Sequence, residues 1–151
     1  MSAQLKTQVF EFCKASVQQK IDRAQQAIKE IQEEANKETK SSAGDKYETG
    51  RAMMHLEKDK HSRQLAEALK LKQTLQLVNT ESRSEQIGLG SLVYTSIGNF
   101  YIAISAGKYT ETAEDIHCIS LASPIGQALA GYKEKEKLLF RANTVLIKTI
   151  L

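Results

Sequence analysis

The sequence predicts an α+β protein in two parts, a helical part over residues 1–83 and a sheet-forming part over residues 84–151. Apolar residues recur at helical spacing in the first part, and runs rich in β-branched and aromatic residues follow in the second. Glycine and proline usage changes as well. Gly44 and Gly50 are the only glycines before residue 84, whereas the other six and Pro124 lie after it. The change falls at NTESRSEQIGLG, which we take as the domain boundary.

The first part is expected to form an antiparallel two-helix coiled coil. Its apolar residues repeat with spacings of four and three, the heptad pattern of a coiled coil. This seam consists of Val17, Ile21, Ala24, Ile28, Ile31 and Ala35, and Phe10 continues it upstream. A looser stripe of Met54, Leu65, Leu69, Leu75 and Val78 follows the turn, with His61 and Lys72 near its positions. Two helices joined by a short loop fold back on each other, and a helix over residues 5–40 would reach roughly 50 Å.

The second part is expected to form a small antiparallel sheet with one short helix. The predicted strands are LVYTSI, NFYIAISAG, DIHCISLA and NTVLIKTIL, with turns at residues 98–99 and 106–115. The helix is predicted within SPIGQALAGY, because Ser123 can cap it, Pro124 suits its first position and Gly131 can end it. We expect the base of the helical hairpin to pack against this sheet.

Composition excludes several classes of protein. The chain of 151 residues has no apolar run of the length that spans a membrane, and its first residues do not resemble a secretory signal. Cys13 and Cys118 lie in segments of different character, so we expect reduced thiols and a cytoplasmic protein. The net charge is +3, with all of the excess in residues 1–83, which is too little to indicate nucleic-acid binding by itself.

The sequence does not indicate a stand-alone enzyme. His55 and His61 are six residues apart, and His117 and Cys118 are neighbours in a predicted strand, so neither pair has metal-ligand spacing on one face. We expect structural or surface roles for these histidines. The sequence has neither a glycine-rich phosphate loop nor a Gly-x-Ser-x-Gly nucleophile motif.

The turn SSAGDKYETGR, residues 41–51, carries the most informative polar residues. Asp45 with Glu48 three residues later matches a capping box, in which Asp45 would be the N-cap of the second helix. A capping carboxylate keeps a second oxygen, so a functional role stays open. Two carboxylates make an incomplete Mg²⁺ site, because Mg²⁺ takes one or two carboxylates and completes its shell with waters or phosphates. Such a turn could supply half of a metal site to a partner.

Two motifs resemble those of the bacterial Gre transcript-cleavage factors. GDKYE, residues 44–48, is similar to that family's tip motif, in which Gly-Asp is followed by a Glu three residues after the Asp. ISLASPIGQALAGY, residues 119–132, resembles the family's Ser-Pro-Ile/Val motif and the short helix after it. The chain length and the order of the parts agree too, so the resemblance covers nearly the whole chain.

The resemblance implies an FKBP-like fold for residues 84–151 and a monomer whose acidic tip, residues 41–48, enters the secondary channel of bacterial RNA polymerase. Asp45 and Glu48 match the acids that help hold the second Mg²⁺ beside the 3′ end of backtracked RNA. This ion would be shared with the polymerase and not bound by the protein alone. The polymerase performs the cleavage, so the protein is not itself an enzyme. A second cation supports the attacking oxygen in two-metal phosphodiester hydrolysis.

Further residues take their expected roles from the same resemblance. Ser123, Pro124 and Ile125 match part of the segment that contacts the rim of the polymerase channel. Lys40, Lys46 and Arg51 surround the tip and could contact RNA phosphates, although a solvated helix face explains them as well.

Two alternative functions remain open. Residues 49–52, Thr-Gly-Arg-Ala, differ from the family's usual continuation of the tip, which favours a regulator that occupies the same channel without stimulating cleavage. An FKBP-like fold also suggests a peptidyl-prolyl isomerase, but fold alone is a poor basis for assigning an activity. Shortening of backtracked RNA distinguishes the first function from the non-cleaving regulator, and a peptide isomerisation assay tests the isomerase.

Overall fold

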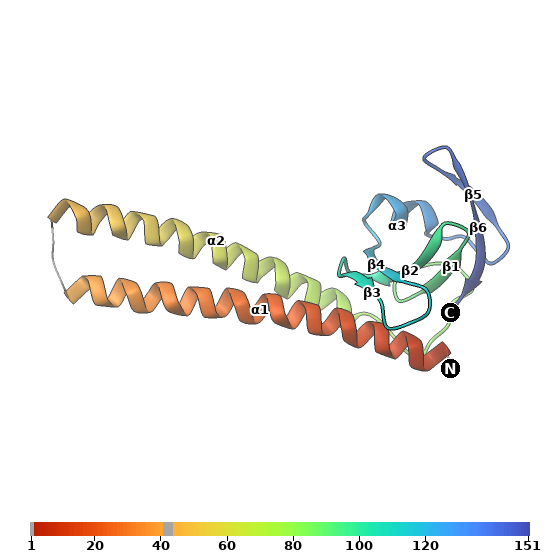
Figure 1. Ribbon diagram of the computed structural model, residues 1–151, viewed down its shortest axis with the longest axis horizontal. Helices are drawn as coiled ribbons and strands as arrows, with labels where there is room; N and C mark the ends of the chain where they lie inside the picture. Colours follow the sequence, from red (N-terminus) through yellow and green to blue (C-terminus); the bar gives the residue numbers. More distant parts are fainter. Residues whose placement is uncertain (1, 41–43) are drawn as a thin grey trace. The chain divides into compact units, whose positions relative to one another are not determined.

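The structure, a computed structural model, describes the backbone of residues 2–40 and 44–151 and the side chains of residues 3–37 and 49–151. Two long helices precede a six-stranded sheet with one short helix, so the protein is α+β as the sequence predicts (Figure 1). The chain divides into two compact units. The coil unit is Val17–Lys72, and the sheet unit combines Met1–Ser16 with Gln73–Leu151. None of the described helices combines the length and apolar character that a membrane crossing requires.

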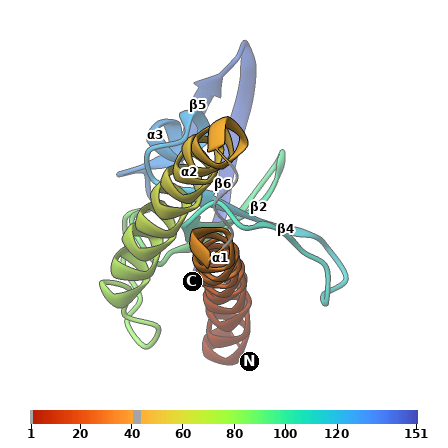
Figure 2. The ribbon, with the colours of Figure 1, turned by 90° about the vertical axis from the view of Figure 1, so that its left-hand side faces the viewer.

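The coil unit contains most of the helices α1 (Ser2–Lys40) and α2 (Gly44–Gln76), which run antiparallel (Figure 1). Viewed from the turn end, α2 passes across α1 at an angle (Figure 2). The α1 seam is buried at Val17, Ile21 and Ala24. Ile28, Ile31 and Ala35, further along the same seam, are only half-buried. Apolar burial between the helices therefore decreases toward the turn, where Lys58 Nζ donates a hydrogen bond to Gln32 Oε1 at 3.0 Å.

The α2 stripe differs from its prediction at two positions. Ala68 is buried and Leu71 half-buried, whereas Leu69 is 41% exposed and Lys72 is exposed. Spacings of three, three and four lead from Leu65 through Ala68 and Leu71 to Leu75, so a small residue occupies the seam where the larger Leu69 was expected. Side-chain size suggested Leu69, but helical phase determines which residue faces the partner helix.

The sheet unit holds six strands in the order β3-β4-β2-β1-β6-β5. Their bounds in chain order are β1 Leu92–Thr95, β2 Gly98–Ala103, β3 Gly107–Tyr109, β4 Ile116–Ser120, β5 Lys137–Phe140 and β6 Asn143–Ile150. The short helix α3, Pro124–Leu129, lies between β4 and β5. Strands β1, β4 and β6 fall within the predicted segments, and β2 overlaps its predicted segment but begins one residue earlier, at Gly98.

The remaining details of the sheet were not predicted. β3 lies inside the expected 106–115 turn, β5 was not anticipated, and the β1–β2 turn falls at residues 96–97 instead of 98–99. The sheet is also not wholly antiparallel, because β4 pairs with β2 in parallel. β3 returns the chain along the outer side of β4. β4 therefore starts from the same end of the sheet as β2 and runs in the same direction.

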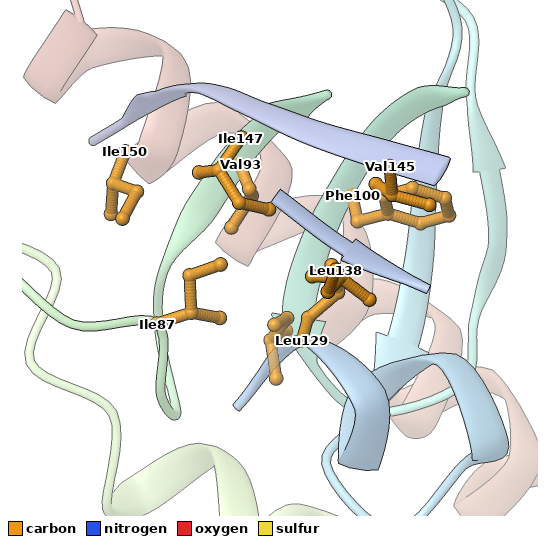
Figure 3. Close-up of a cluster of buried hydrophobic side chains, with 9 residues drawn as sticks. Ile87, Val93, Phe100, Leu129, Leu138, Val145, Ile147 and Ile150 are labelled. Carbon is orange, nitrogen blue, oxygen red and sulfur yellow. The ribbon is translucent and has the colours of Figure 1, made fainter. Parts of the chain in front are cut away.

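The main hydrophobic core lies between one face of the sheet and α3 (Figure 3). It is formed by Ile87, Val93, Phe100, Ile102, Leu129, Leu138, Val145, Ile147 and Ile150. Phe100 and Ile102 alternate along β2, which directs both to the same face. Leu129, fully buried, is the contribution of α3. Burial of one such side chain contributes about 1.5–3 kcal/mol, so this cluster fixes α3 against the sheet.

The opposite face of the sheet is covered by the beginning of α1. Tyr101 of β2 and Cys118 of β4 are register partners on this face, and both are buried. Val9 and Cys13, one helical turn apart in α1, are fully buried. Burial here follows Val9, Cys13 and Val17 at spacings of four, whereas Phe10, the expected continuation of the seam, is half-buried. The buried positions of α1 differ from the predicted coiled-coil seam because this part of the helix packs against the sheet and not against α2.

Two further contacts attach the start of α1 to the sheet unit. The Phe12 ring meets the Tyr109 ring edge-on, with centroids 5.5 Å apart. Lys6 is 5% exposed, and its Nζ donates a hydrogen bond to the carbonyl of Ser82 at 2.8 Å. Burial lowers the pKa of Lys6, and the nearby Arg83 lowers it further. This desolvated ammonium group is therefore stabilised by a carbonyl oxygen of the segment that follows α2.

Val9→Ala tests whether the first turns of α1 belong to the sheet unit. We expect the free energy of unfolding of this unit to fall by about 1–3 kcal/mol, because a buried side chain would be replaced by a cavity. The exposed neighbour offers a control, since Gln8→Ala should change the free energy by no more than about 0.5 kcal/mol. Urea titration followed by circular dichroism measures both, and equal effects of the two substitutions would contradict the packing.

Candidate functional site

The predicted acidic tip lies where the chain reverses between α1 and α2. α1 ends at Lys40 and α2 begins at Gly44, so the backbone of Asp45 and Glu48 is helical. Residues 41–43, and the side chains of Lys40, Asp45, Lys46 and Glu48, lie outside the described residues. The structure therefore gives the position of both acids along the helix but no contact of their carboxylates.

The prediction that Asp45 is the N-cap of the second helix is wrong. An N-cap residue has a non-helical backbone, whereas α2 already includes Gly44 and Asp45. Asp45 and Glu48 instead fall at the N-terminal end of the helix. Negative charge is stabilising there, because the unpaired N–H groups and the helix dipole present partial positive charge. Positions three apart in a helix also share a face, so this spacing suits two ligands of one ion.

Described residues on both sides of the turn are exposed. Asn36 and Lys37 are exposed near the end of α1, as are Thr49 and Arg51 near the start of α2. Arg51, one of the three predicted RNA-contacting cations, is therefore open to solvent.

A shallow groove of about 420 Å³ lies between the helices of the coil unit. Its lining is Ala27, Glu30, Ile31, Glu34, Met53, Met54, Glu57 and His61. His61 Nε2 is 3.6 Å from Glu57 Oε2, and His61 Nδ1 is 2.9 Å from Gln64 Oε1. These contacts assign His61 to the polar surface of the coil. Within the described residues, no three His, Cys, Asp or Glu side chains lie close enough together to hold a metal ion.

The second predicted motif forms the cap and first turn of α3. Ser123 is the N-cap, as predicted, and its Oγ accepts a hydrogen bond from the backbone N–H of Gly126 at 3.1 Å. The same hydroxyl donates a hydrogen bond to the carbonyl of Ser120 at 2.7 Å. Pro124 opens the helix, and Gly131, at φ +86°, follows its end in the left-handed conformation that favours glycine.

The three predicted rim residues differ in what they offer to a partner. Ser123 is half-buried and uses its hydroxyl within the protein, and Ile125 is half-buried against the hydrophobic core. Pro124 is exposed, and Leu121 just before it is 39% exposed. The accessible part of this segment is therefore apolar and is shaped by the Ser123 cap.

Gly126 is the closest approach of α3 to the preceding loop. A Cβ at this position would clash with the carbonyl oxygen of Ser120 and lie 2.9 Å from Ser123 Oγ. Both atoms belong to the cap, so the absence of a side chain is required by packing. The sequence contains this glycine in SPIGQ, but its pattern did not reveal the requirement.

A pair of cysteines forms a third group of interest, which the sequence analysis did not predict. Cys13 and Cys118 lie in segments of different character, yet both are buried on the α1-covered face of the sheet, where each thiol shifts the pKa of the other. Both are free thiols. The signal was present in the spacing of Val9, Cys13 and Val17 and in the strand alternation at Cys118, but these patterns cannot show that α1 crosses this strand.

Compared with protein-family models and with curated proteins, the chain matches none. The likeness to the Gre factors therefore rests on the two motifs and on the order of the helical and sheet-forming parts.

Gly126→Ala tests the tight packing at the α3 cap. We expect the free energy of unfolding of the sheet unit to fall by about 1–3 kcal/mol, because the added methyl group would push α3 away from the Ser120 carbonyl. Gln127→Ala, at an exposed position of the same helix, should change it by no more than about 0.5 kcal/mol. Thermal or urea unfolding measures both, and a neutral or stabilising Gly126→Ala would rule out this packing.

Proposed function

We propose that the protein enters the secondary channel of a bacterial RNA polymerase and stimulates cleavage of backtracked RNA. In this proposal Asp45 and Glu48 help to hold a second Mg²⁺, and the polymerase performs the hydrolysis. The observation that carries the proposal is the start of α2 at Gly44, directly after the reversal of two long antiparallel helices. Both acids therefore belong to the end of the coil unit. The protein would act as a monomer in the cytoplasm.

The chemistry explains why such a pair requires a partner. Mg²⁺ prefers six oxygen ligands in octahedral geometry and gives up its waters reluctantly. Two carboxylates supply a minority of these ligands and leave positions for the polymerase, the RNA phosphate and the attacking water. A second metal ion stabilises the attacking oxygen in phosphodiester hydrolysis. Two acids delivered from outside would thus raise the occupancy of an ion that the polymerase holds weakly.

The coil unit provides the reach that this role needs. Residues 17–40 of α1 form one continuous helix that runs roughly 35 Å at about 1.5 Å per residue. The described residues beside the turn are exposed, which suits insertion into a narrow channel. The exposed guanidinium of Arg51 also suits contact with an RNA phosphate, and Lys40 and Lys46 are proposed for the same role.

The α3 segment supports the second contact of the proposal. Pro124 and Leu121 present apolar surface beside a helix that is fixed by the Ser123 cap and by Leu129 in the core. We propose that Pro124 contacts the channel rim directly. Ser123 and Ile125 would then hold the shape of this surface from within the sheet unit.

A specific observation favours a non-cleaving regulator as the second candidate. Gly50 lies within α2, only two residues after Glu48. Glycine in a helix interior costs about 1 kcal/mol relative to alanine, so it weakens the helix that carries the acids. Looser positioning of the carboxylates would reduce metal binding while leaving insertion into the channel intact.

The isomerase alternative gains no support from the sheet unit. A groove of about 480 Å³ there is lined by Arg83, Ser84, Glu85, Lys133, Glu134 and Ile150. Arg83 Nη2 and Glu134 Oε1 are 3.1 Å apart, and Glu134 Oε1 also accepts a hydrogen bond from the N–H of Ile150 at 2.9 Å. Proline-binding pockets need aromatic walls, whereas this lining is mainly charged.

Replacement of both tip acids tests the proposal. We expect Asp45→Ala/Glu48→Ala to reduce RNA cleavage in backtracked complexes to the level of polymerase alone, because the second Mg²⁺ loses its added ligands. Binding to polymerase should persist, since the α3 surface is unchanged. Cleavage is read as shortened 5′-labelled RNA over a Mg²⁺ titration, and binding by co-elution with the polymerase.

The matched control removes the same charge elsewhere on α2. Asp59→Ala/Glu67→Ala alters two exposed acids away from the turn and should leave cleavage unchanged. If the wild-type chain binds polymerase but yields no shortened RNA, the non-cleaving regulator replaces the first proposal. Failure to bind polymerase at all would reject both.

A further inference from the structure

Cys13 and Cys118 form a buried pair that the proposed function does not use. Cys13 is fully buried in α1, and Cys118 of β4 is 3% exposed. They come from distant parts of the chain, yet both are buried on the α1-covered face of the sheet, and each thiol shifts the pKa of the other. The contact of Phe12 with Tyr109 lies next to this pair, because Tyr109 belongs to β3 beside β4. Two independent contacts therefore fix α1 at this point of the sheet.

The two sulfur atoms are chemically unequal. The Cys13 thiol lowers the pKa of Cys118, which makes Cys118 the better thiolate. The Cys118 thiol, together with burial, raises the pKa of Cys13. One reactive thiolate beside a second, protonated thiol is the arrangement that turns a first oxidation product into a disulfide.

A buried hydroxyl group completes the surroundings of the pair. Tyr101 is the register partner of Cys118, is fully buried, and has no hydrogen-bond partner for its hydroxyl among the described residues. Burial and the neighbouring thiols raise the pKa of Tyr101, so the hydroxyl keeps its proton. It is a donor that can bind an oxygen atom transferred to the adjacent sulfur.

The edge of the sheet beside Cys118 has one position without a side chain. Gly107 of the edge strand β3 is the register partner of Cys118 on the other side from Tyr101. A Cβ built at Gly107 would meet no atom within 4 Å. Because β3 is only three residues long and Gly107 has no side chain, the edge of the sheet next to Cys118 is thinly covered.

We propose that Cys13 and Cys118 are an oxidation site, at which a peroxide converts two thiols into a disulfide between α1 and β4. The Cys118 thiolate attacks one peroxide oxygen, the O–O bond breaks, and hydroxide leaves with a sulfenic acid formed on Cys118. The Cys13 sulfur then attacks the Cys118 sulfur and releases its oxygen as water. Two thiols and one hydrogen peroxide give one disulfide and two waters, so the sulfur atoms are oxidised and the peroxide is reduced.

The disulfide would fix covalently the part of α1 that the sheet unit now holds by packing. Residues 3–16 of the helix could no longer separate from β4. The oxidised chain would therefore unfold at higher temperature than the reduced chain, because the crosslink restricts the unfolded state. This inference does not depend on the proposed function, since it concerns the chain alone.

The test exposes the folded, reduced full-length chain to hydrogen peroxide and follows intact mass and free thiols. We expect both thiols to disappear with a mass loss of about 2 Da, reversed by dithiothreitol. The folded chain should form the intramolecular disulfide at least about tenfold faster than the same chain in concentrated urea, because the fold holds the sulfur atoms in contact. The oxidised form should also show a raised melting temperature.

Two variants separate the roles of the thiols. Cys13→Ser should stop at a sulfenic acid on Cys118, trapped by dimedone, whereas Cys118→Ser should leave Cys13 largely unreacted. Retention of both thiols in the folded chain, sulfinic acid without disulfide, or equal rates in the folded and urea-unfolded wild type would overturn the proposal. The wild-type comparison decides the question even if a serine variant does not fold.

Discussion

The structure depends on the packing of the first turns of α1 against one face of the sheet. Val9 and Cys13 close that face over Tyr101 and Cys118, and Lys6 bonds to the carbonyl of Ser82. Without this cover the sheet would expose the apolar side chains of this face, since α3 protects only the other. A small sheet buries too little surface to remain stable in that state. One helix therefore belongs to both compact units.

This constraint relates the two candidate sites of the protein. α1 continues without a break from the sheet to the turn at Lys40, so the helix held at Val9 also carries one side of the acidic tip. Its apolar seam is well buried at Val17 and Ile21 and only half-buried at Ile31. The apolar packing between the helices is thus concentrated away from the turn.

Much of the fold could be predicted from the sequence because local patterns determine it. The heptad spacing gave the helices, and Ser123, Pro124 and Gly131 gave α3 with its cap. The errors arise where tertiary contacts decide. β3 is too short to show alternation of apolar and polar residues. The parallel pairing of β4 with β2 depends on the path of the chain, which no local pattern encodes. Ala68, and not Leu69, is the buried residue of α2 at the helix contact.

The candidate sites also divide into features that local sequence patterns predict and features that only tertiary contacts determine. The spacing of Asp45 and Glu48 is visible in the sequence, although their exact place in the helix was not. The Cys13–Cys118 contact joins distant segments and could not be predicted without the sheet. The need for glycine at position 126 could not be predicted either, because it arises from the nearby Ser120 carbonyl, which leaves no space for a side chain.

Native-state hydrogen exchange tests the packing of α1 on the sheet most directly. Amides protected by the same cooperative unit exchange with the same opening free energy. We predict that the amides of residues 9–13 in α1 share the slow exchange of Tyr101 and Ile102 in β2 and lose protection together with them in denaturant. Exchange of residues 9–13 as fast as that of a frayed helix end, with β2 still protected, would contradict the account.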